Sequence, residues 1–194
     1  MEPITLTTDR LRLRPFASAD VDAVTAACQD PDIQRWTQVP SPYTRPDADF
    51  FVNRLVPQGW REDGEYGFAV EPLEGGPLLA AAGLHARGPG VREVGFWLVR
   101  EHRGHGYMTE VVDALARWAF TSLGVHRLVW RAEIGNTPSR AVAERAGFTM
   151  EGVERAGLTN KGTVRDAWVA SLLPSDLGLP SPLPYLPAKA DADA

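Results

Sequence analysis

The chain of 194 residues contains a single cysteine, Cys28, so an intramolecular disulfide is excluded. We expect this thiol to be a small buried group on a helix, because nothing near it in the sequence supplies a base or an orienting partner. Apolar runs are short, and none approaches the roughly 20 residues of a membrane span. The first ten residues also lack the apolar segment of a secretory signal. These absences predict a cytoplasmic protein with no membrane partner.

Positive charge is also in short supply. The chain has 20 Lys and Arg against 25 Asp and Glu, a net charge of −5, whereas broad nucleic-acid binding usually needs a basic face. We therefore expect no direct nucleic-acid partner. His102, His105 and His126 have no metal-ligand spacing with one another or with Cys28, so no metal is predicted either.

The hydrophobic fraction of 44% is enough for one well-packed domain. We expect this domain to span residues 1–173, and the Pro- and Ala-rich residues 174–194 to form an extended or disordered tail. Helical spacing of apolar residues predicts helices at Val21–Cys28, at about Asp47–Val56, at about Tyr107–Leu123 and at Pro138–Ala146. Strands are expected around Leu6 and at Leu11–Arg14, Tyr66–Val70, Leu78–Leu84, Val91–Val99, Arg127–Ala132, Phe148–Glu154 and Thr163–Leu172.

Residues 100–109 read R-E-H-R-G-H-G-Y-M-T and join a predicted strand to a predicted helix. A turn with two glycines at a helix start presents unpaired backbone N–H groups and the positive end of the helix dipole, which suits a phosphate. The third glycine of a dinucleotide fingerprint is missing, and so is the Lys-Ser/Thr of a P-loop. The segment therefore predicts a phosphate-binding turn of another kind.

This turn, R-G-H-G-Y-M, resembles the R/Q-x-x-G-x-G/A pyrophosphate loop of the GNAT acyltransferases. About thirty residues later, N-T-P-S-R-A-V-A-E-R-A-G-F resembles the N-x-x-S-x-x-x-x-E-K-x-G-F signature of that family, with Arg145 in place of the usual Lys. The two motifs and the strand ahead of them cover roughly residues 91–172, and the opening T-D-R-L-R-L-R-P-F adds support. Within the family, the chain resembles the ribosomal-protein alanine and serine N-terminal acetyltransferases (RimJ/RimL-like).

The resemblance implies an α/β (α+β) GNAT fold, a mixed and splayed sheet of six to seven strands flanked by about four helices. It also implies acetyl-CoA as co-substrate, with the pantetheine arm in the wedge between the strands that contain Val99 and Val129. Met108 departs from the family's Gly or Ala, so we expect this side chain to turn into the core. The residues implied to bind the cofactor are Leu98, Val99, Arg103, Gly104, His105, Gly106, Tyr107, Met108, Thr109, Asn136 and Arg145.

Acyl transfer to an amine needs a neutral amine, a polarised thioester and a departing thiolate. E-V-G-F-W resembles the E-x-G-Y-W of the N-terminal acetyltransferases, which makes Glu93 the candidate base; a solvated carboxylate at a strand end is the alternative. Ala143 occupies the position at which many family members have a tyrosine that acts as the general acid. The resemblance offers Ser139 as the acid instead, and a simple role at the helix start is the alternative.

Trp36, Tyr43, Trp60 and His85 lie on segments that shape the acceptor pocket in the family, and each is expected to be a core or rim residue. The leading hypothesis is transfer of an acetyl group to a primary amine, most simply a peptide or protein N-terminus, in a ternary complex. Acylation of a small-molecule amine, a bulkier acyl group and a non-catalytic acyl-CoA sensor are the alternatives. A homodimer is compatible with the sequence.

Overall fold

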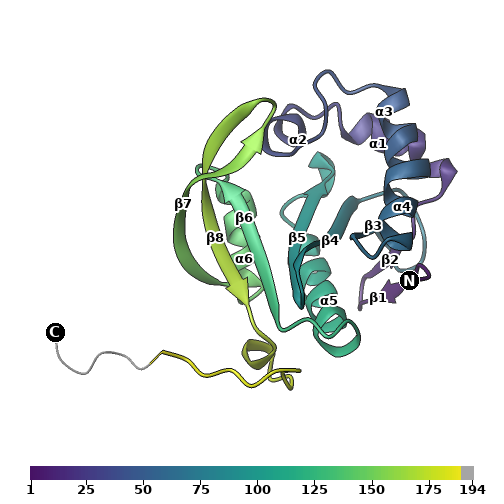
Figure 1. Cartoon of the computed structure of the whole chain (residues 1–194). Helices are drawn as coiled ribbons and strands as arrows, with labels where there is room; N and C mark the ends of the chain where they lie inside the picture. The colour runs from purple at the N-terminus through teal and green to yellow at the C-terminus, as the bar shows by residue number, and fades with distance from the viewer. Residues whose placement is uncertain (189–194) are drawn as a thin grey trace.

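The computed structural model describes residues 1–188, and its centre is a single eight-stranded sheet in the order β1-β2-β3-β4-β5-β6-β8-β7 (Figure 1). The sheet has more strands than the six to seven expected, and one of its edges is a two-residue strand. The strands are β1 Leu6–Thr7, β2 Leu11–Arg14, β3 Glu65–Pro72, β4 Ala80–Gly88, β5 Val91–Leu98, β6 Arg127–Glu133, β7 Thr149–Asn160 and β8 Thr163–Leu172.

One junction in this sheet is unlike the others, because β5 and β6 run parallel and pair over a short stretch only. Val91 to Glu93 of β5 face Arg127 to Val129 of β6, and beyond Glu93 the two strands separate. β6 turns away with β8, to which it pairs from Leu128 to Glu133. Figure 1 shows the resulting wedge, which opens toward the carboxyl ends of both strands. The splayed sheet expected from the resemblance is confirmed.

The helices are α1 Val21–Ala27, α2 Pro31–Trp36, α3 Arg45–Phe50, α4 Val56–Arg61, α5 Tyr107–Ser122 and α6 Thr137–Arg145. Alternation along the strands separates two faces of the sheet. Phe68, Ala82 and Val94 belong to the core shared with α5, whereas Ala69 of β3 belongs to a second cluster with α1 and α3. We call the second side the α1–α4 face. No helix within residues 1–188 has the length and apolar character to cross a membrane.

The sequence predicted the elements well where apolar periodicity is regular, but α2 was not expected. Its six residues are too few to show a helical period, and it begins at a proline, Pro31. The helix expected at about Asp47–Val56 is longer, because a π turn at Phe51–Leu55 joins α3 to α4.

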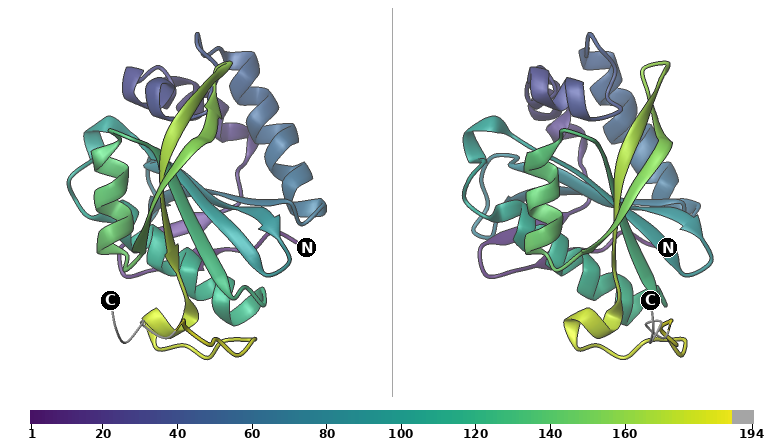
Figure 2. Two further views of the ribbon diagram at one scale, coloured as in Figure 1. Left: turned by 60° about the vertical axis from the view of Figure 1, so that its left-hand side comes forward. Right: turned by 90° about the vertical axis from the view of Figure 1, so that its left-hand side faces the viewer.

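Part of the sequence assigned to the C-terminal tail contacts the domain. Pro174–Leu177 forms a 3₁₀ turn, and Leu177 and Leu179 pack against the main core. Residues 180–188 have no regular secondary structure, and residues 189–194 lie outside the described part of the chain. In Figure 2 the β7–β8 hairpin rises above the sheet toward the α1–α4 helices.

Candidate active site

The turn between β5 and α5 has the geometry of an anion receptor. Gly104 and Gly106 both have left-handed backbones, with φ of 83° and 78°, a conformation that glycine adopts without strain. Gly106 precedes α5, and no side chain caps this helix start. The first backbone N–H groups of a 16-residue helix therefore point toward any ligand on the turn. Met108 is 3% exposed and lies in the core, so its side chain does not obstruct the turn.

The end of the second motif lies beside this turn, although the motif begins about thirty residues later in the sequence. An open hollow of about 580 Å³ is lined by Gly106 and Thr109 at the start of α5, by Arg145 at the end of α6, and by Leu177 of the C-terminal segment, together with Glu110, Asp113, Ala146 and Gly147. The structure thus places Arg145, expected from the resemblance, within the same hollow as the glycine turn.

One cation at this turn was missed by reasoning from the sequence. Arg10, from the segment T-D-R-L-R, donates a hydrogen bond to the carbonyl of His105 at 3.1 Å and lies over the ring of Tyr107 at 4.8 Å. Its guanidinium is also paired with Glu110, the first acidic residue of α5, at 2.5 Å. In the sequence, the T-D-R segment supports only the resemblance to the family. Arg10 lies far from the turn along the chain, so no motif spacing predicts this contact.

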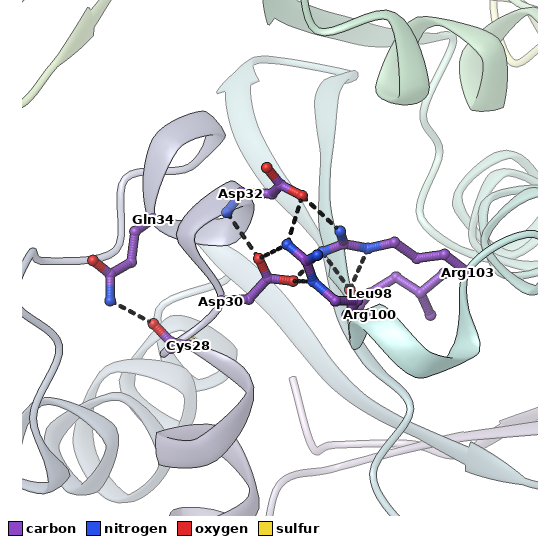
Figure 3. Close-up of polar contacts among 7 residues, drawn as sticks. All are labelled: Cys28, Asp30, Asp32, Gln34, Leu98, Arg100 and Arg103. Carbon is purple, nitrogen blue, oxygen red and sulfur yellow. Dashed lines mark hydrogen bonds and ion pairs between the residues drawn. The ribbon is translucent and has the colours of Figure 1, made fainter.

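Arg103 and Arg100, next to the glycine turn, are both bound to Asp30 and Asp32 at the start of α2 (Figure 3). Arg103 contacts Asp30 at 2.7 Å and Asp32 at 3.0 Å, and Arg100 contacts the same two side chains at 3.1 and 3.2 Å. Arg103 also donates to the carbonyl of Leu98, a group expected to face the pantetheine. Burial would raise the pKa of Asp30, but the neighbouring guanidinium groups lower it overall. The charge expected of Arg103 is therefore shared with α2 in this structure.

The other end of α2 contacts the far side of the wedge. Arg35 forms two hydrogen bonds with Glu133, the last residue of β6, at 2.7 and 2.8 Å, and these hold the pKa of Glu133 below its usual range. The carbonyls of Gln34 and Arg35 accept hydrogen bonds from Lys161 and Asn160 at the β7–β8 turn. We call α2 with these contacts the α2 bridge, because it connects the two strands that the wedge separates.

Glu93 lies at the narrow end of the wedge, where β5 and β6 last pair. Its Oε2 accepts hydrogen bonds from Arg87 at 2.7 Å and from Arg131 at 2.9 Å, and its side chain is only 12% exposed. Arg131 belongs to β6, so this ion pair joins the two strands directly below the opening. Nothing in the sequence around Glu93 indicates that two arginines bind this carboxylate.

Ser139 lies in the first turn of α6 and faces a buried indole. Trp130, 1% exposed, donates its Nε1–H to Oγ of Ser139 at 3.1 Å. The amide of Ser139 donates to Oδ1 of Asn136, so the asparagine also serves as the cap of α6. Because the oxygen of Ser139 already accepts a hydrogen bond, its own O–H proton can be donated elsewhere.

The four acceptor-side candidates divide into two pairs. Tyr43 and Trp60 are core residues, 6% and 1% exposed. Trp36, on the α2 bridge, lies against Gly135 of the β6–α6 connection, and His85 lies on the α1–α4 face beside β5. Cys28 is buried as expected, and burial raises the pKa of its thiol to about 12. Within residues 1–188 no three side chains of His, Cys, Asp or Glu are grouped closely enough to hold a metal ion.

The family model described as an acetyltransferase (GNAT) domain matches residues 10–149, which include both the glycine turn and the second motif. The chain belongs to the GNAT acetyltransferase family. It is therefore an acyl-CoA-dependent N-acyltransferase, and acetyl-CoA is its co-substrate.

Similar proteins agree with this assignment. The uncharacterized N-acetyltransferase p20 of Bacillus licheniformis is 28% identical over 171 residues, which are 87% of this chain and 96% of that protein. The ribosomal-protein-serine acetyltransferase of Escherichia coli (strain K12) is 35% identical over 60 residues, 31% of this chain and 34% of that protein. The structure of Mycobacterium smegmatis RimJ in complex with CoA-disulfide has a TM-score of 0.80 at 20% identity, covers 94% of both chains, and shares the fold.

Proposed function

We propose that this GNAT enzyme transfers the acetyl group of acetyl-CoA to the N-terminal amine of a peptide or protein. The observation that carries the proposal is the combination of the glycine turn with the β5–β6 wedge. The turn presents uncapped N–H groups at the start of α5, and β5 leads from the narrow end of the wedge to that turn. One extended ligand with a pyrophosphate at one end and a thioester at the other fits this arrangement.

The residues around the wedge supply the rest of the proposed chemistry. Backbone groups of Leu98 and Val99, with Asn136, would hold the pantetheine, while the amides of residues 104–109 would hold the pyrophosphate, with Arg103 and Arg145 as cations. The hydroxyl of Ser139 would donate a proton to the departing thiolate. Glu93 and His85 are two titratable side chains that lie opposite each other on β5 and β4, and one of them would take the proton of the amine.

A peptide is favoured as the acceptor by the surface beside Glu93. An open hollow of about 500 Å³ lies there, lined by Arg87, Glu93, Arg131, Glu151 and Glu154 together with Val129, Gly152, Val153 and Val169. Such an open surface suits an extended polar chain, whereas small ligands usually bind in pockets that enclose most of their surface. The E. coli relative is named for a ribosomal-protein substrate, which is the same acceptor class.

The proposal is tested by thiol release from acetyl-CoA over a panel of acceptors. The panel contains short peptides with free N-termini, the same peptides with blocked N-termini, polyamines, amino acids and an aminoglycoside. Turnover with free peptides and none with blocked ones is expected, with mass spectrometry placing the acetyl group on the α-amine. Turnover restricted to the small amines would replace the peptide with a small-molecule acceptor. Binding of acetyl-CoA without turnover on any acceptor would favour the alternative of a non-catalytic acyl-CoA sensor.

A further inference from the structure

Three glycines lie next to one another across β3, β4 and β5. Gly67 pairs with Gly83, and Gly83 pairs with Gly95, so this row has no side chains. Neighbouring side chains lie directly on the strands as a result. Val56 of α4 lies over Gly67, and the imidazole of His85 lies over Gly95, where a Cβ would come within 2.9 Å of Nε2. The absence of a side chain at Gly95 is therefore what allows His85 to lie across β5.

The position of Gly95 places this imidazole at the opening of the wedge. The last β5 residue that pairs with β6 is Glu93, and Gly95 follows two residues later on the same face of the strand. Its neighbour on one side is Gly83 of β4, and on the other side the partner strand has already separated. The Nε2 atom of His85 thus lies on the α1–α4 face beside the gap into which the thioester would extend.

Across the same three strands, His85 lies between two carboxylates, and these carboxylates have different environments. Glu65 of β3 and Glu93 of β5 both pair with His85 of β4. Oε2 of Glu65 lies 3.4 Å from Nδ1 of His85. The negative charge of this carboxylate favours the imidazole tautomer with its proton on Nδ1, in which Nε2 carries the lone pair above Gly95.

Glu93 is less suited to meet an amine directly. Its Oε2 already accepts hydrogen bonds from two guanidinium groups and its side chain is 12% exposed. The side chain of His85 is 41% exposed. An incoming amine can reach the imidazole without displacing a guanidinium group, and histidine is the side chain most often used for general acid–base catalysis.

We propose that His85 is the general base of the reaction, with Glu65 orienting its ring and Glu93 holding β5 to β6 through Arg131. This assignment rests on the proposed function. In the proposed step, Nε2 of His85 takes a proton from the acceptor ammonium, and the neutral nitrogen attacks the thioester carbon. A C–N bond forms and the C–S bond breaks. The thiolate leaves with the electron pair, and the second proton lost by the attacking nitrogen passes to it through the hydroxyl of Ser139 or through water.

The test compares His85→Gln with His126→Gln. The second substitution removes the histidine beside Gly90, away from the opening. We expect His85→Gln to lower kcat by about 10²- to 10³-fold, within the range of general-base catalysis, with the Kd for CoA unchanged. His126→Gln should retain wild-type kcat. Glu65→Gln should lower kcat by about 10-fold, because the ring keeps its chemistry and loses its orienting partner.

Added imidazole separates a chemical role from a structural one. In His85→Ala, free imidazole should restore part of kcat in proportion to its concentration and should leave wild type and Ser139→Ala unaffected. Wild-type kcat in His85→Gln, or a loss in His85→Ala that imidazole does not restore, overturns the assignment while acetyl transfer stands. A folded wild-type protein that binds acetyl-CoA and acetylates no amine overturns the proposed function and the assignment together.

Discussion

Glu93 on β5 and Arg131 on β6 form an ion pair of 2.9 Å at the last position where the two strands are paired. The pair closes the narrow end of the wedge on the α1–α4 face. Arg131 also contacts Glu154 and the carbonyl of Gly157 on β7, so one guanidinium connects three strands. The wedge is thus held at its narrow end by Glu93 and across its open end by the α2 bridge.

Glu93→Gln should act mainly on stability. The amide oxygen carries no full negative charge, so its hydrogen bonds to the two guanidinium groups are weaker, and a loss of about 1–3 kcal/mol in unfolding free energy is expected. A fall in kcat of less than 10-fold should accompany it if His85 is the base. Urea unfolding and steady-state kinetics measure the two effects. A fall of about 10²- to 10⁴-fold at unchanged stability would instead identify Glu93 as the base.

Ser139→Ala should slow acetyl transfer by about 10- to 10³-fold, because the thiolate then lacks its proposed proton donor. The loss should be smaller than that for the base, since a thiol with a pKa of about 8.5 is a tolerable leaving group. Ser122→Ala, which removes a hydroxyl at the exposed end of α5, is the control and should behave as wild type. Unchanged kcat in folded Ser139→Ala would remove this hydroxyl from the mechanism.

Trp130→Phe tests whether the indole N–H positions that hydroxyl. Phenylalanine keeps an aromatic ring at this buried position but lacks the N–H donor, so kcat should fall by about 3- to 10-fold with the KM for acetyl-CoA unchanged. In the Ser139→Ala background the same substitution should have no further effect on kcat. An equal loss in both backgrounds would indicate that Trp130 acts through packing.

Asp30→Asn combined with Asp32→Asn should strengthen CoA binding by about 3- to 10-fold, or about 0.7–1.4 kcal/mol. Both substitutions preserve side-chain size, and Asn at position 30 still caps α2. The released Arg100 and Arg103 add uncompensated positive charge beside the glycine turn. Calorimetry at two salt concentrations measures the effect, and Asp22→Asn, which breaks the exposed pair with Arg45, is the control. Unchanged or weaker binding would show that these arginines do not assist the pyrophosphate.

The α2 bridge should weaken in acid. The pKa of Glu133 is lowered by its hydrogen bonds to Arg35, so its stabilising contribution is complete above the unfolded-state value of about 4.3 and is lost as pH falls through the lower folded-state value. The difference in unfolding free energy between wild type and Glu133→Gln should therefore be present at pH 7 and vanish in strong acid. Glu62→Gln, which removes a carboxylate facing Gln58, is the control. A difference that is independent of pH would contradict this account.

The sequence alone identified the family, the strand–turn–helix around Gly104 and Gly106, and the second motif with Ser139, because these signals are local. A glycine at a helix start and an apolar period of 3.6 residues can be recognised within one segment. The same holds for the burial of Cys28 and for the inward turn of Met108, since each follows from an apolar position on a helix.

The surroundings of these groups were decided only by the tertiary structure. Arg131 lies 38 residues from Glu93 in sequence, and Asp30 lies 73 residues from Arg103, and no periodicity connects such positions. The short helix α2 could not be predicted because a single turn has little propensity of its own and forms through its contacts at both ends. The orientation of His85 depends on Gly95 in the neighbouring strand, so it follows from sheet register, which pairing across the whole fold determines.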